Sequence, residues 1–362
     1  MTPLRVRFGT IHPGMPGGIY VTEKPFEDAL AAGGEVEVRS IPFGRRFPDE
    51  SRAGRIARRA ADLAGFVLTV LRERPDLVHL NSAFDRRALV RDVGYATLAR
   101  LLGQRVFFKF HGSDPTVLES GSRFWRWMAA ATIRGAIAIG VLSTEERDWF
   151  VAHGFPAGKF HVVKNAVDWR RFDGAERRAP SPPRLLFIAR MVPTKGLLDV
   201  LRALALLRGA GRDVTLLCVG DGPERPAAEA LTRELGLGGA VVFTGFVPEA
   251  ETRRHYLEAS ALVFPTRREG FSMTIFQSLA AGLPVITTRL RAAADHLREP
   301  DHCLWVEPAR PDRLAERVAW LLDHPEVAEA MSRNGRALAR GFGVETVAAE
   351  YLALYRRLCG SA

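Results

Sequence analysis

One segment of the chain combines an acidic residue, free backbone amides and a helix start in an order suited to ligand chemistry. Glu269 begins the sequence Glu-Gly-Phe-Ser-Met-Thr, which lies between the apolar runs 261–265 and 285–288. This order predicts a strand, an acidic turn, a helix and a second strand. In a parallel sheet such a turn lies at the carboxyl end of a strand, where ligands bind and helix N-termini attract anions. Glu269 and the amides of Gly270, Phe271 and Ser272 therefore suit a polyhydroxylated, negatively charged ligand such as a nucleotide sugar.

Two cations flank a turn earlier in the same half of the chain. Arg190 and Lys195 follow the apolar run 184–188 and border the helical segment 196–207. At a strand-to-helix turn they can bind a diphosphate together with the N-terminus of the next helix. A pair of surface cations without a ligand is the alternative interpretation, which the strand end in a cleft-forming domain weakens.

Two segments of the first half carry weaker signals of the same kind. The stretch 9–19 contains Gly17 and Gly18 and follows the first expected strand, and glycine lets a backbone approach a ligand closely. It lacks the G-x-G-x-x-G spacing, so a purely structural turn is an equal alternative. His111 follows the expected strand 106–110, where an imidazole can bind a sugar hydroxyl or carry a proton. A loop histidine without a special role is the alternative there.

Apolar runs of strand length alternate with helical segments through both halves of the chain. This alternation predicts parallel α/β sheets with helices on both faces. The strands are expected at residues 4–8, 35–39, 77–80, 106–110, 136–142, 160–163, 184–188, 214–219, 241–243, 261–264, 284–287 and 303–306. The helices between them include 52–72, 87–102, 196–207, 226–235 and 273–281.

A change of composition divides the chain. Residues 173–183 are rich in Pro, Ala and charged residues, and they predict a linker. The expected domains are therefore residues 1–172 and 184–345, followed by a helix at 346–362. Two doubly wound domains on one linker are expected to enclose a cleft, and hinge closure around a ligand follows naturally.

The composition sets the broad class. The chain has 362 residues, of which 47% are apolar and 25% charged, as in soluble globular proteins. It contains no run of 18 apolar residues, so we expect no membrane span, and the start of the chain is too charged for a signal peptide. Three widely spaced cysteines predict neither a disulfide framework nor a metal cluster, which fits the cytoplasm.

The net charge of +10 is concentrated in the first half. Residues 45–134 contain 17 Lys or Arg against 9 Asp or Glu, and residues 123–127 mix arginines with indoles. A solvated basic face is one interpretation. The other is a surface that rests on anionic lipid or meets an anionic or lipid-linked acceptor. Nucleic acid is not expected as a partner, because no recognition motif accompanies the charge.

Together these residues resemble the retaining glycosyltransferases of family 4, which have the GT-B fold of two Rossmann-like domains facing across a cleft. Each motif is short, but their order covers nearly the whole chain. The motifs that carry the resemblance are Gly17-Gly18, His111-Gly112, Asn165-Ala166-Val167-Asp168, Arg190 with Lys195, Gly220-Asp221-Gly222-Pro223, Phe243-Thr244-Gly245-Phe246 and the segment that begins at Glu269.

The resemblance implies a role for each residue of the second half. Arg190 and Lys195 would hold the donor diphosphate. Glu269, with the amides from Gly270 to Met273, would hold the donor sugar. The loop formed by Gly245, Phe246 and Val247 would border the base. These are implications of the family pattern and not of the spacing itself.

The same resemblance assigns the first half and shows one departure. Gly17 and Gly18 would lie against the phosphates or the acceptor, and His111 near the transferred sugar. The family pattern places a second Glu eight positions after the first, where it binds the ribose hydroxyls. Here that position is Gln277, which keeps one acceptor oxygen but is neutral and also donates.

The expected reaction is transfer of a sugar from a nucleoside-diphosphate sugar to a hydroxyl of a glycan or lipid-linked acceptor, as in polysaccharide biosynthesis. A UDP-sugar is favoured and GDP-mannose comes next. No metal or cofactor is expected, because the protein cations would neutralise the diphosphate. The expected location is the cytoplasm, and a peripheral position on the inner face of the membrane is the alternative to a freely soluble protein. A GT-B nucleotide-sugar epimerase and a non-catalytic nucleotide- or carbohydrate-binding protein are the alternatives.

Overall fold

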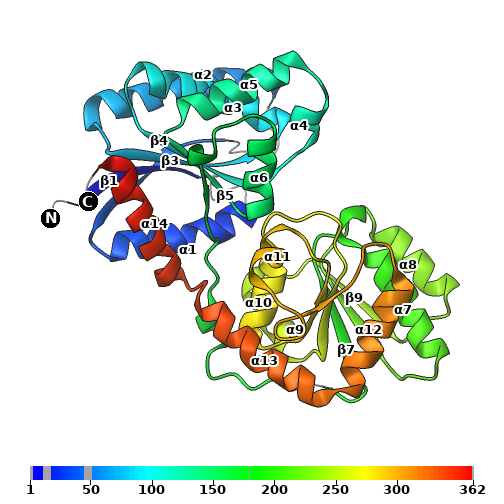
Figure 1. Ribbon diagram of the computed structural model, residues 1–362. Helices are drawn as coiled ribbons and strands as arrows, with labels where there is room; N and C mark the ends of the chain where they lie inside the picture. The colour runs from blue at the N-terminus through cyan, green and yellow to red at the C-terminus, as the bar shows by residue number, and fades with distance from the viewer. Residues whose placement is uncertain (1–2, 11–17, 45–50, 179, 361–362) are drawn as a thin grey trace. The chain divides into compact units, whose positions relative to one another are not determined.

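The computed structural model describes residues 3–10, 18–44, 51–178 and 180–360 (Figure 1). The chain forms two compact units. Unit 1 consists of Met1–Ala166 and Val344–Ala362, and unit 2 consists of Val167–Gly343.

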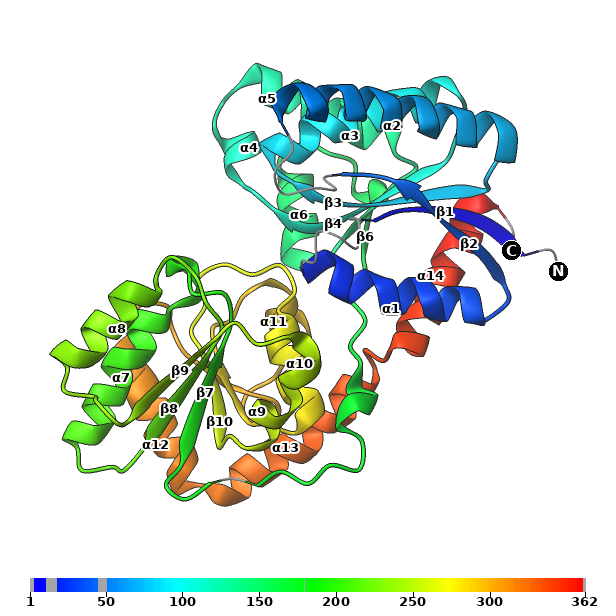
Figure 2. The same cartoon turned by 180° about the vertical axis from the view of Figure 1, so that it is seen from behind.

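Unit 1 is built on a six-stranded parallel sheet. Its strands, in the order β2-β1-β3-β4-β5-β6, are β1 (Leu4–Thr10), β2 (Val36–Pro42), β3 (Leu77–Phe84), β4 (Val106–Ser113), β5 (Ala138–Val141) and β6 (Phe160–Val162). The helices are α1 (Gly18–Ala32), α2 (Arg52–Glu73), α3 (Arg86–Leu101), α4 (Thr116–Glu119), α5 (Arg123–Gly135), α6 (Thr144–Ala152) and α14 (Val344–Cys359). Figures 1 and 2 show α2, α3 and α5 on one face of the sheet and α1 and α14 on the other.

Local chemistry explains where the helices of unit 1 begin. The hydroxyl of Ser51 accepts from the amide of Gly54 at 3.1 Å and caps α2. The carboxylate of Asp85 accepts from the amides of Arg87 and Ala88 at 2.8 and 2.9 Å and caps α3. Such caps satisfy amides that have no carbonyl partner within the helix.

The last helix of the chain completes the core of unit 1. Tyr351 and Tyr355 of α14 are buried, and the ring of Tyr351 packs against Phe26 of α1 at a centroid distance of 4.6 Å. The hydroxyl of Tyr355 pairs with Nδ1 of the fully buried His79 on β3. Residues 344–362 therefore belong to the same unit as residues 1–166.

Unit 2 contains a second six-stranded parallel sheet. Its strands, in the order β12-β11-β10-β7-β8-β9, are β7 (Arg184–Ile188), β8 (Thr215–Val219), β9 (Val241–Gly245), β10 (Ala261–Phe264), β11 (Val285–Thr287) and β12 (Leu304–Trp305). On one face lie α7 (Leu197–Gly209), α8 (Arg225–Glu234) and α12 (Pro311–Asp323). On the other lie α9 (Arg253–Leu257), α10 (Met273–Ala281), α11 (Arg291–His296) and α13 (Pro325–Arg340) (Figures 1 and 2).

The expected α/β class is confirmed, with two parallel sheets that carry helices on both faces. The chain enters unit 2 at Val167, ahead of the segment 173–183. That segment is anchored inside unit 2, where Arg177 donates to the carbonyls of Gly282 and Ala259 at 3.0 and 2.6 Å. Its composition is that of a linker, but partly buried hydrogen bonds hold it to its own unit.

In both sheets the strand order reverses direction at one point. Unit 2 runs from β7 outward through β8 and β9, and then returns to place β10 on the other side of β7. In unit 1 the reversal lies between β1 and β3. Open α/β sheets bind ligands outside the carboxyl ends of the strands at such points.

Candidate functional site

The reversal point of unit 2 brings together two of the residues predicted from the sequence. Lys195 ends the 3-10 turn Pro193–Lys195 after β7, and Glu269 lies in the turn after β10. The ammonium of Lys195 forms an ion pair with Oε1 of Glu269. Their side chains are 20% and 18% exposed, so the pair is largely covered but open on one side. A cation and a carboxylate thus share one position at the carboxyl edge of the sheet.

Backbone contacts fix these two turns against each other. Gly196 has a φ of 79°, and a Cβ atom there would lie 2.5 Å from the carbonyl oxygen of Pro265. The amide of Arg267 and the hydroxyl of Thr266 both donate to the carbonyl of Thr194, at 2.8 and 3.0 Å. Only glycine permits this approach at position 196, because a side chain would collide with backbone.

The N-terminus of α10 points unsatisfied donors at the same edge. The hydroxyl of Ser272, at the N-cap position, forms no cap hydrogen bond. Ser272 is 6% exposed, and its hydroxyl has no hydrogen-bond partner among the described residues. The ring of Phe271 stacks on Phe276 with centroids 4.1 Å apart, which anchors the start of the helix. This arrangement can receive an anion or a hydroxyl-rich group.

Arg190 follows β7, in the same connecting segment as Lys195. Its side chain is exposed and forms no ion pair or hydrogen bond within the described chain. The amide of Met191 donates to the carbonyl of Asp221 after β8 at 2.8 Å. A Cβ atom at Gly222 would lie 2.3 Å from the carbonyl oxygen of Met191, so the turns after β7 and β8 are also in contact.

The expected base-bordering loop follows β9 at the same edge of the sheet. The carbonyl of Gly245 accepts from the amide of Gly220 at 2.9 Å. The ring of Phe246 is 80% exposed, and Val247 is partly buried. An exposed aromatic ring at a strand end can stack on a planar group.

Gln277 faces the interior of unit 2. Its amide oxygen accepts from the hydroxyl of Tyr256 at 2.8 Å, and its amide nitrogen donates to Oε1 of Glu249 at 2.6 Å. The same Glu249 oxygen pairs with Arg171. Both ends of the Gln277 amide are therefore already used, and a carboxylate at this position would repel Glu249.

His111 of unit 1 belongs to a buried polar cluster at the carboxyl end of β4. Its Nε2 lies 3.1 Å from Oδ1 of Asn81 and 3.6 Å from Oε1 of Glu23. Lys109 forms an ion pair with the same Glu23 oxygen at 2.6 Å, and both side chains are almost fully buried. The second oxygen of Glu23 has no hydrogen-bond partner among the described residues.

Burial controls the charge of this cluster. Desolvation, together with the Lys109 charge, lowers the pKa of His111 and of His79 well below the usual 6.5. Desolvation also lowers the pKa of Lys109, while its contact with Glu23 raises it. His111 is therefore a neutral imidazole near pH 7, which can either donate or accept one hydrogen bond at Nε2.

Two glycines predicted to contact the ligand remain. Gly17 lies outside the described residues, and Gly18 is the first residue of α1. Among the described residues, no group of three or more His, Cys, Asp or Glu side chains is placed to hold a metal ion. In the same part of the chain, no helix has both the length and the apolar character needed to cross a bilayer.

Sequence reasoning missed several residues that position the two sites. In unit 2, Arg267 donates to the buried Asp199 of α7 at 2.9 Å, which ties the Glu269 turn to the helix after Lys195. In unit 1, Glu23 and Asn81 contact His111 from α1 and β3. Asn81 is a polar residue in an apolar segment, whereas Glu23 lies among other polar residues, and neither signal identifies a partner.

Two family models match the chain. The model described as "Glycosyl transferases group 1" matches residues 170–338. The model described as "Glycosyl transferase 4-like domain" matches residues 6–166. The two matches fall on either side of the passage between the units.

Individual proteins are similar over most of the chain. The 2-deoxystreptamine glucosyltransferase of Streptomyces kanamyceticus is 32% identical over 282 residues, which are 72% of this chain and 73% of that protein. The alpha-D-kanosaminyltransferase of the same organism is 25% identical over 280 residues, 72% of each chain. The crystal structure of Anabaena HepE in complex with UDP and glucose superposes with a TM-score of 0.73 at 19% identity, covering 97% of this chain and 98% of the other.

The lowered pKa values of His79 and His111 predict an acid-dependent loss of stability. In the unfolded chain each imidazole takes up a proton near pH 6.5, whereas in unit 1 it does so only at lower pH. Between these two pKa values the unfolded state binds more protons than the folded state. The contribution of each histidine to the free energy of unfolding is therefore complete above about pH 6.5 and decreases as the pH falls. Each unit by which the pKa of a histidine is lowered corresponds to about 1.4 kcal/mol in the free energy of unfolding.

Calorimetric melting from pH 7.5 to 5.5 measures this effect. His111→Gln, which keeps a polar group beside Asn81, is expected to reduce the fall in melting temperature. His153→Gln serves as the control, because His153 follows α6 outside this cluster. An unchanged pH dependence in His111→Gln would show that the imidazole is not held neutral.

Proposed function

The chain belongs to the glycosyl transferases of group 1, and on this premise we propose that it moves a sugar from a nucleoside-diphosphate sugar to an acceptor hydroxyl with retention at the anomeric carbon. It is a glycosyltransferase with the GT-B fold. The observation that carries the donor assignment is the meeting of Lys195, Glu269 and the N-terminus of α10 at the reversal point of unit 2.

The diphosphate of the donor is assigned to the cations of this edge. Arg190 is exposed and unpaired within the described chain, so it can bind a phosphate without losing another contact. Lys195 is paired with Glu269 and would exchange that carboxylate, in part or wholly, for a phosphate oxygen. The helix dipole would further stabilise an anion bound at the N-terminus of α10.

Glu269 is then released to accept from the hydroxyls of the donor sugar. The amides of Gly270, Phe271 and Ser272 come before the first turn of α10, and Met273 begins the helix. They can donate to sugar or phosphate oxygens, while the buried hydroxyl of Ser272 supplies one more group without a partner in the described chain. A ligand rich in both hydroxyls and anionic oxygens uses all of these groups.

The proposed reaction needs no protein nucleophile. The bond from the anomeric carbon to the diphosphate oxygen breaks, and a bond from the same carbon to the acceptor oxygen forms on the same face. The acceptor proton passes to the departing phosphate oxygen. Lys195, Arg190 and the helix amides stabilise the negative charge that grows on the leaving group, which is electrostatic catalysis without a metal ion.

The base of the nucleotide is assigned to the loop after β9. Gly245 has a φ of 76°, which favours glycine, Phe246 offers an exposed ring, and Val247 follows it in the chain. A UDP-sugar is the favoured donor, supported by the UDP and glucose in the HepE complex, and GDP-mannose comes next. Gln277 already accepts from Tyr256 and donates to Glu249, so a ribose hydroxyl would use its second N–H or the second lone pair of its oxygen.

The acceptor is assigned to unit 1 as a glycan or a lipid-linked sugar, and His111 to a position near the transferred sugar. The layer of α2, α3 and α5 would rest on the inner face of an anionic membrane. It exposes Ile56 (70%), Leu71 (57%), Phe124 (56%) and Trp127 (57%) among several arginines. Apolar and cationic side chains on one helical layer favour binding at the boundary between head groups and acyl chains.

Nucleotide binding tests the donor assignment directly. A thermal-shift titration with UDP, GDP and ADP is expected to give the largest increase in melting temperature with UDP. At a concentration of one hundred times Kd, a ligand that binds only the folded state adds about 2.7 kcal/mol of stability. If none of the three raises the melting temperature, unit 2 does not bind a nucleoside diphosphate and the proposed donor is wrong.

Removal of the cation beside Glu269 is expected to affect chemistry more than folding. Lys195→Ala should lower turnover of the donor by about 10²- to 10³-fold, because one group that stabilises the developing anion is lost. It should change stability by only about 1 kcal/mol, since the pair is partly exposed to solvent.

A coupled assay for the released nucleoside diphosphate measures the Lys195 effect, with product analysis separating transfer from hydrolysis. Arg313→Ala is the matched control, because it removes the cation of an exposed pair with Glu316. Glu269→Ala should also reduce turnover strongly through loss of sugar binding. Wild-type turnover in folded Lys195→Ala would refute the diphosphate assignment.

Vesicle binding tests the membrane assignment. Phe124→Ser combined with Trp127→Ser should weaken co-sedimentation with vesicles of phosphatidylglycerol and phosphatidylcholine by about tenfold or more, since that requires a loss of only ~1.4 kcal/mol of apolar burial. Trp320→Ser, at a position of unit 2 that is 37% exposed, is the control. Equal binding by wild type and the double variant would remove this face as the membrane contact.

A further inference from the structure

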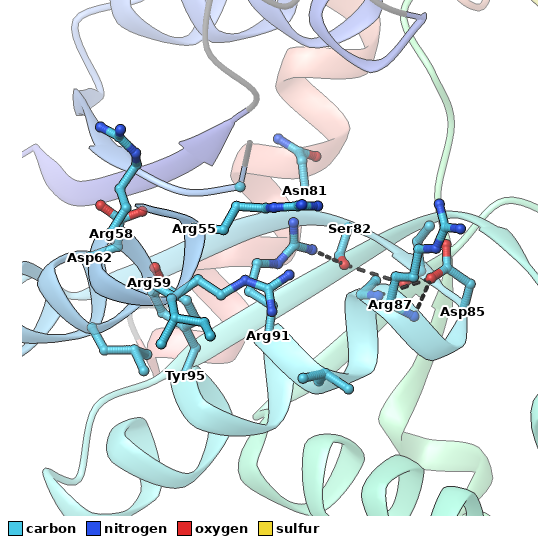
Figure 3. A pocket seen from close by; sticks show the side chains of 16 residues that line it. Arg55, Arg58, Arg59, Asp62, Asn81, Ser82, Asp85, Arg87, Arg91 and Tyr95 are labelled. Atoms are coloured by element: carbon cyan, nitrogen blue, oxygen red, sulfur yellow. Dashed lines mark hydrogen bonds between the residues drawn. The ribbon is translucent and has the colours of Figure 1, made fainter. Parts of the chain in front are cut away.

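A cavity in unit 1 contains none of the residues assigned to the donor. It has a volume of about 460 Å³ and lies between α2, α3 and the carboxyl end of β3, next to Gly44 after β2 (Figure 3). Its residues all belong to unit 1. The cavity therefore lies beside the reversal point of this sheet, between β1 and β3, where open α/β sheets bind ligands.

The wall of the cavity carries an excess of positive charge. Its charged residues are the five cations Arg55, Arg58, Arg59, Arg87 and Arg91 and the two carboxylates Asp62 and Asp85. The carboxylate of Asp85 is already engaged, because it caps the amides at the start of α3. The side chains of Arg55, Arg59 and Arg87 form no ion pair or hydrogen bond within the described chain.

One arginine of the wall is held in place by the protein. Arg91 donates through Nε to Asp92 at 2.7 Å and through a terminal nitrogen to the hydroxyl of Ser82 at 2.6 Å, and its guanidinium lies 3.9 Å from the ring centroid of Phe43. Figure 3 shows Arg55 and Arg59 of α2 extending toward Arg91 of α3. Like charges gathered in this way repel each other unless an anion lies among them.

The other residues of the cavity wall indicate which kind of chemical group is attached to the anion. Ile56, Leu63, Val90 and Tyr95 also line the cavity, and Ile56 and Val90 are 70% and 48% exposed. Guanidinium groups match the oxygens of a phosphate in a bidentate manner. Several guanidiniums around one position favour the higher charge of a phosphate monoester over a single carboxylate, and the apolar wall favours an organic group bound to it.

The cavity is connected to His111 through one residue. Asn81 lines the cavity, and its Oδ1 lies 3.1 Å from Nε2 of His111. A ligand in the cavity therefore lies next to the residue assigned to the neighbourhood of the transferred sugar.

We propose that this cavity binds a phosphate ester carried by the acceptor, with Arg55, Arg59 and Arg91 as its ligands. The acceptor would thus be a phosphorylated molecule, and the assignment as an acceptor subsite rests on the proposed transferase function. Binding of a phosphate in the cavity does not depend on that function, because it requires only residues of unit 1.

Calorimetric titration of the full chain at low ionic strength tests the site. Glycerol 3-phosphate is the soluble probe, dihexanoyl phosphatidic acid below its micellar concentration is the lipid probe, and glycerol is the uncharged control. Arg55→Gln combined with Arg59→Gln should weaken binding of the phosphate probes by about tenfold or more, which corresponds to the loss of a charge-assisted hydrogen bond. Arg72→Gln combined with Arg100→Gln is the matched control, because these exposed arginines lie on the same two helices away from the cavity.

The outcomes separate the sources of the phosphate. Tighter binding of the lipid probe indicates a phospholipid head group, and equal or weaker binding indicates a soluble phosphate ester. Failure of both probes to bind, or an equal loss in the two double variants, would overturn the site. UDP binding, measured in the same samples, should be unchanged by Arg55→Gln with Arg59→Gln, so a failure of the donor assignment is seen independently.

Discussion

Direct contact between the backbones of two turns is the constraint on which the donor-side site depends. The turn after β7 can press against the turn after β10 only because Gly196 has no side chain facing the carbonyl of Pro265. This contact, with the bonds from Arg267 and Thr266 to Thr194, sets Lys195 beside Glu269. Pairing of β7 with β10 across the reversal point places both turns at one edge of the sheet. The strand order brings the two turns close together, and Gly196 allows their backbones to come into contact.

The two units use lysine–glutamate pairs in different ways. The pair of Lys109 and Glu23 is almost fully buried, and a buried ion pair that loses one partner leaves an uncompensated charge. It can therefore help to orient His111, whose pKa is lowered first by burial and then by the Lys109 charge, but it cannot easily exchange partners. The pair of Lys195 and Glu269 is about one fifth exposed, so a ligand can reach it. The difference in exposure fits a positioning role for the first pair and ligand exchange for the second.

Strands and strand-end turns were predictable from the sequence because their signals are local. Apolar runs of strand length identified the β7 and β10 segments, and hence the turns that carry Lys195 and Glu269. Contacts between distant segments were not predictable. Glu23 and Lys109 are 86 positions apart, and the cavity near Arg91 depends on how α2 packs beside α3. The segment 173–183 has the composition of a linker, yet Arg177 ties it to carbonyls more than 80 positions away.

Gln277 shows how such a distant contact can govern a substitution that looks damaging in the sequence. A glutamate there would place its carboxylate where the Gln277 nitrogen now donates to Glu249, at 2.6 Å. Two carboxylates at that separation repel strongly, and one of them would have to take up a proton or move. Glutamine removes the repulsion and donates instead, while its oxygen keeps the bond from Tyr256. With Arg171 paired to the same Glu249 oxygen, the local chemistry favours the amide over the acid at position 277.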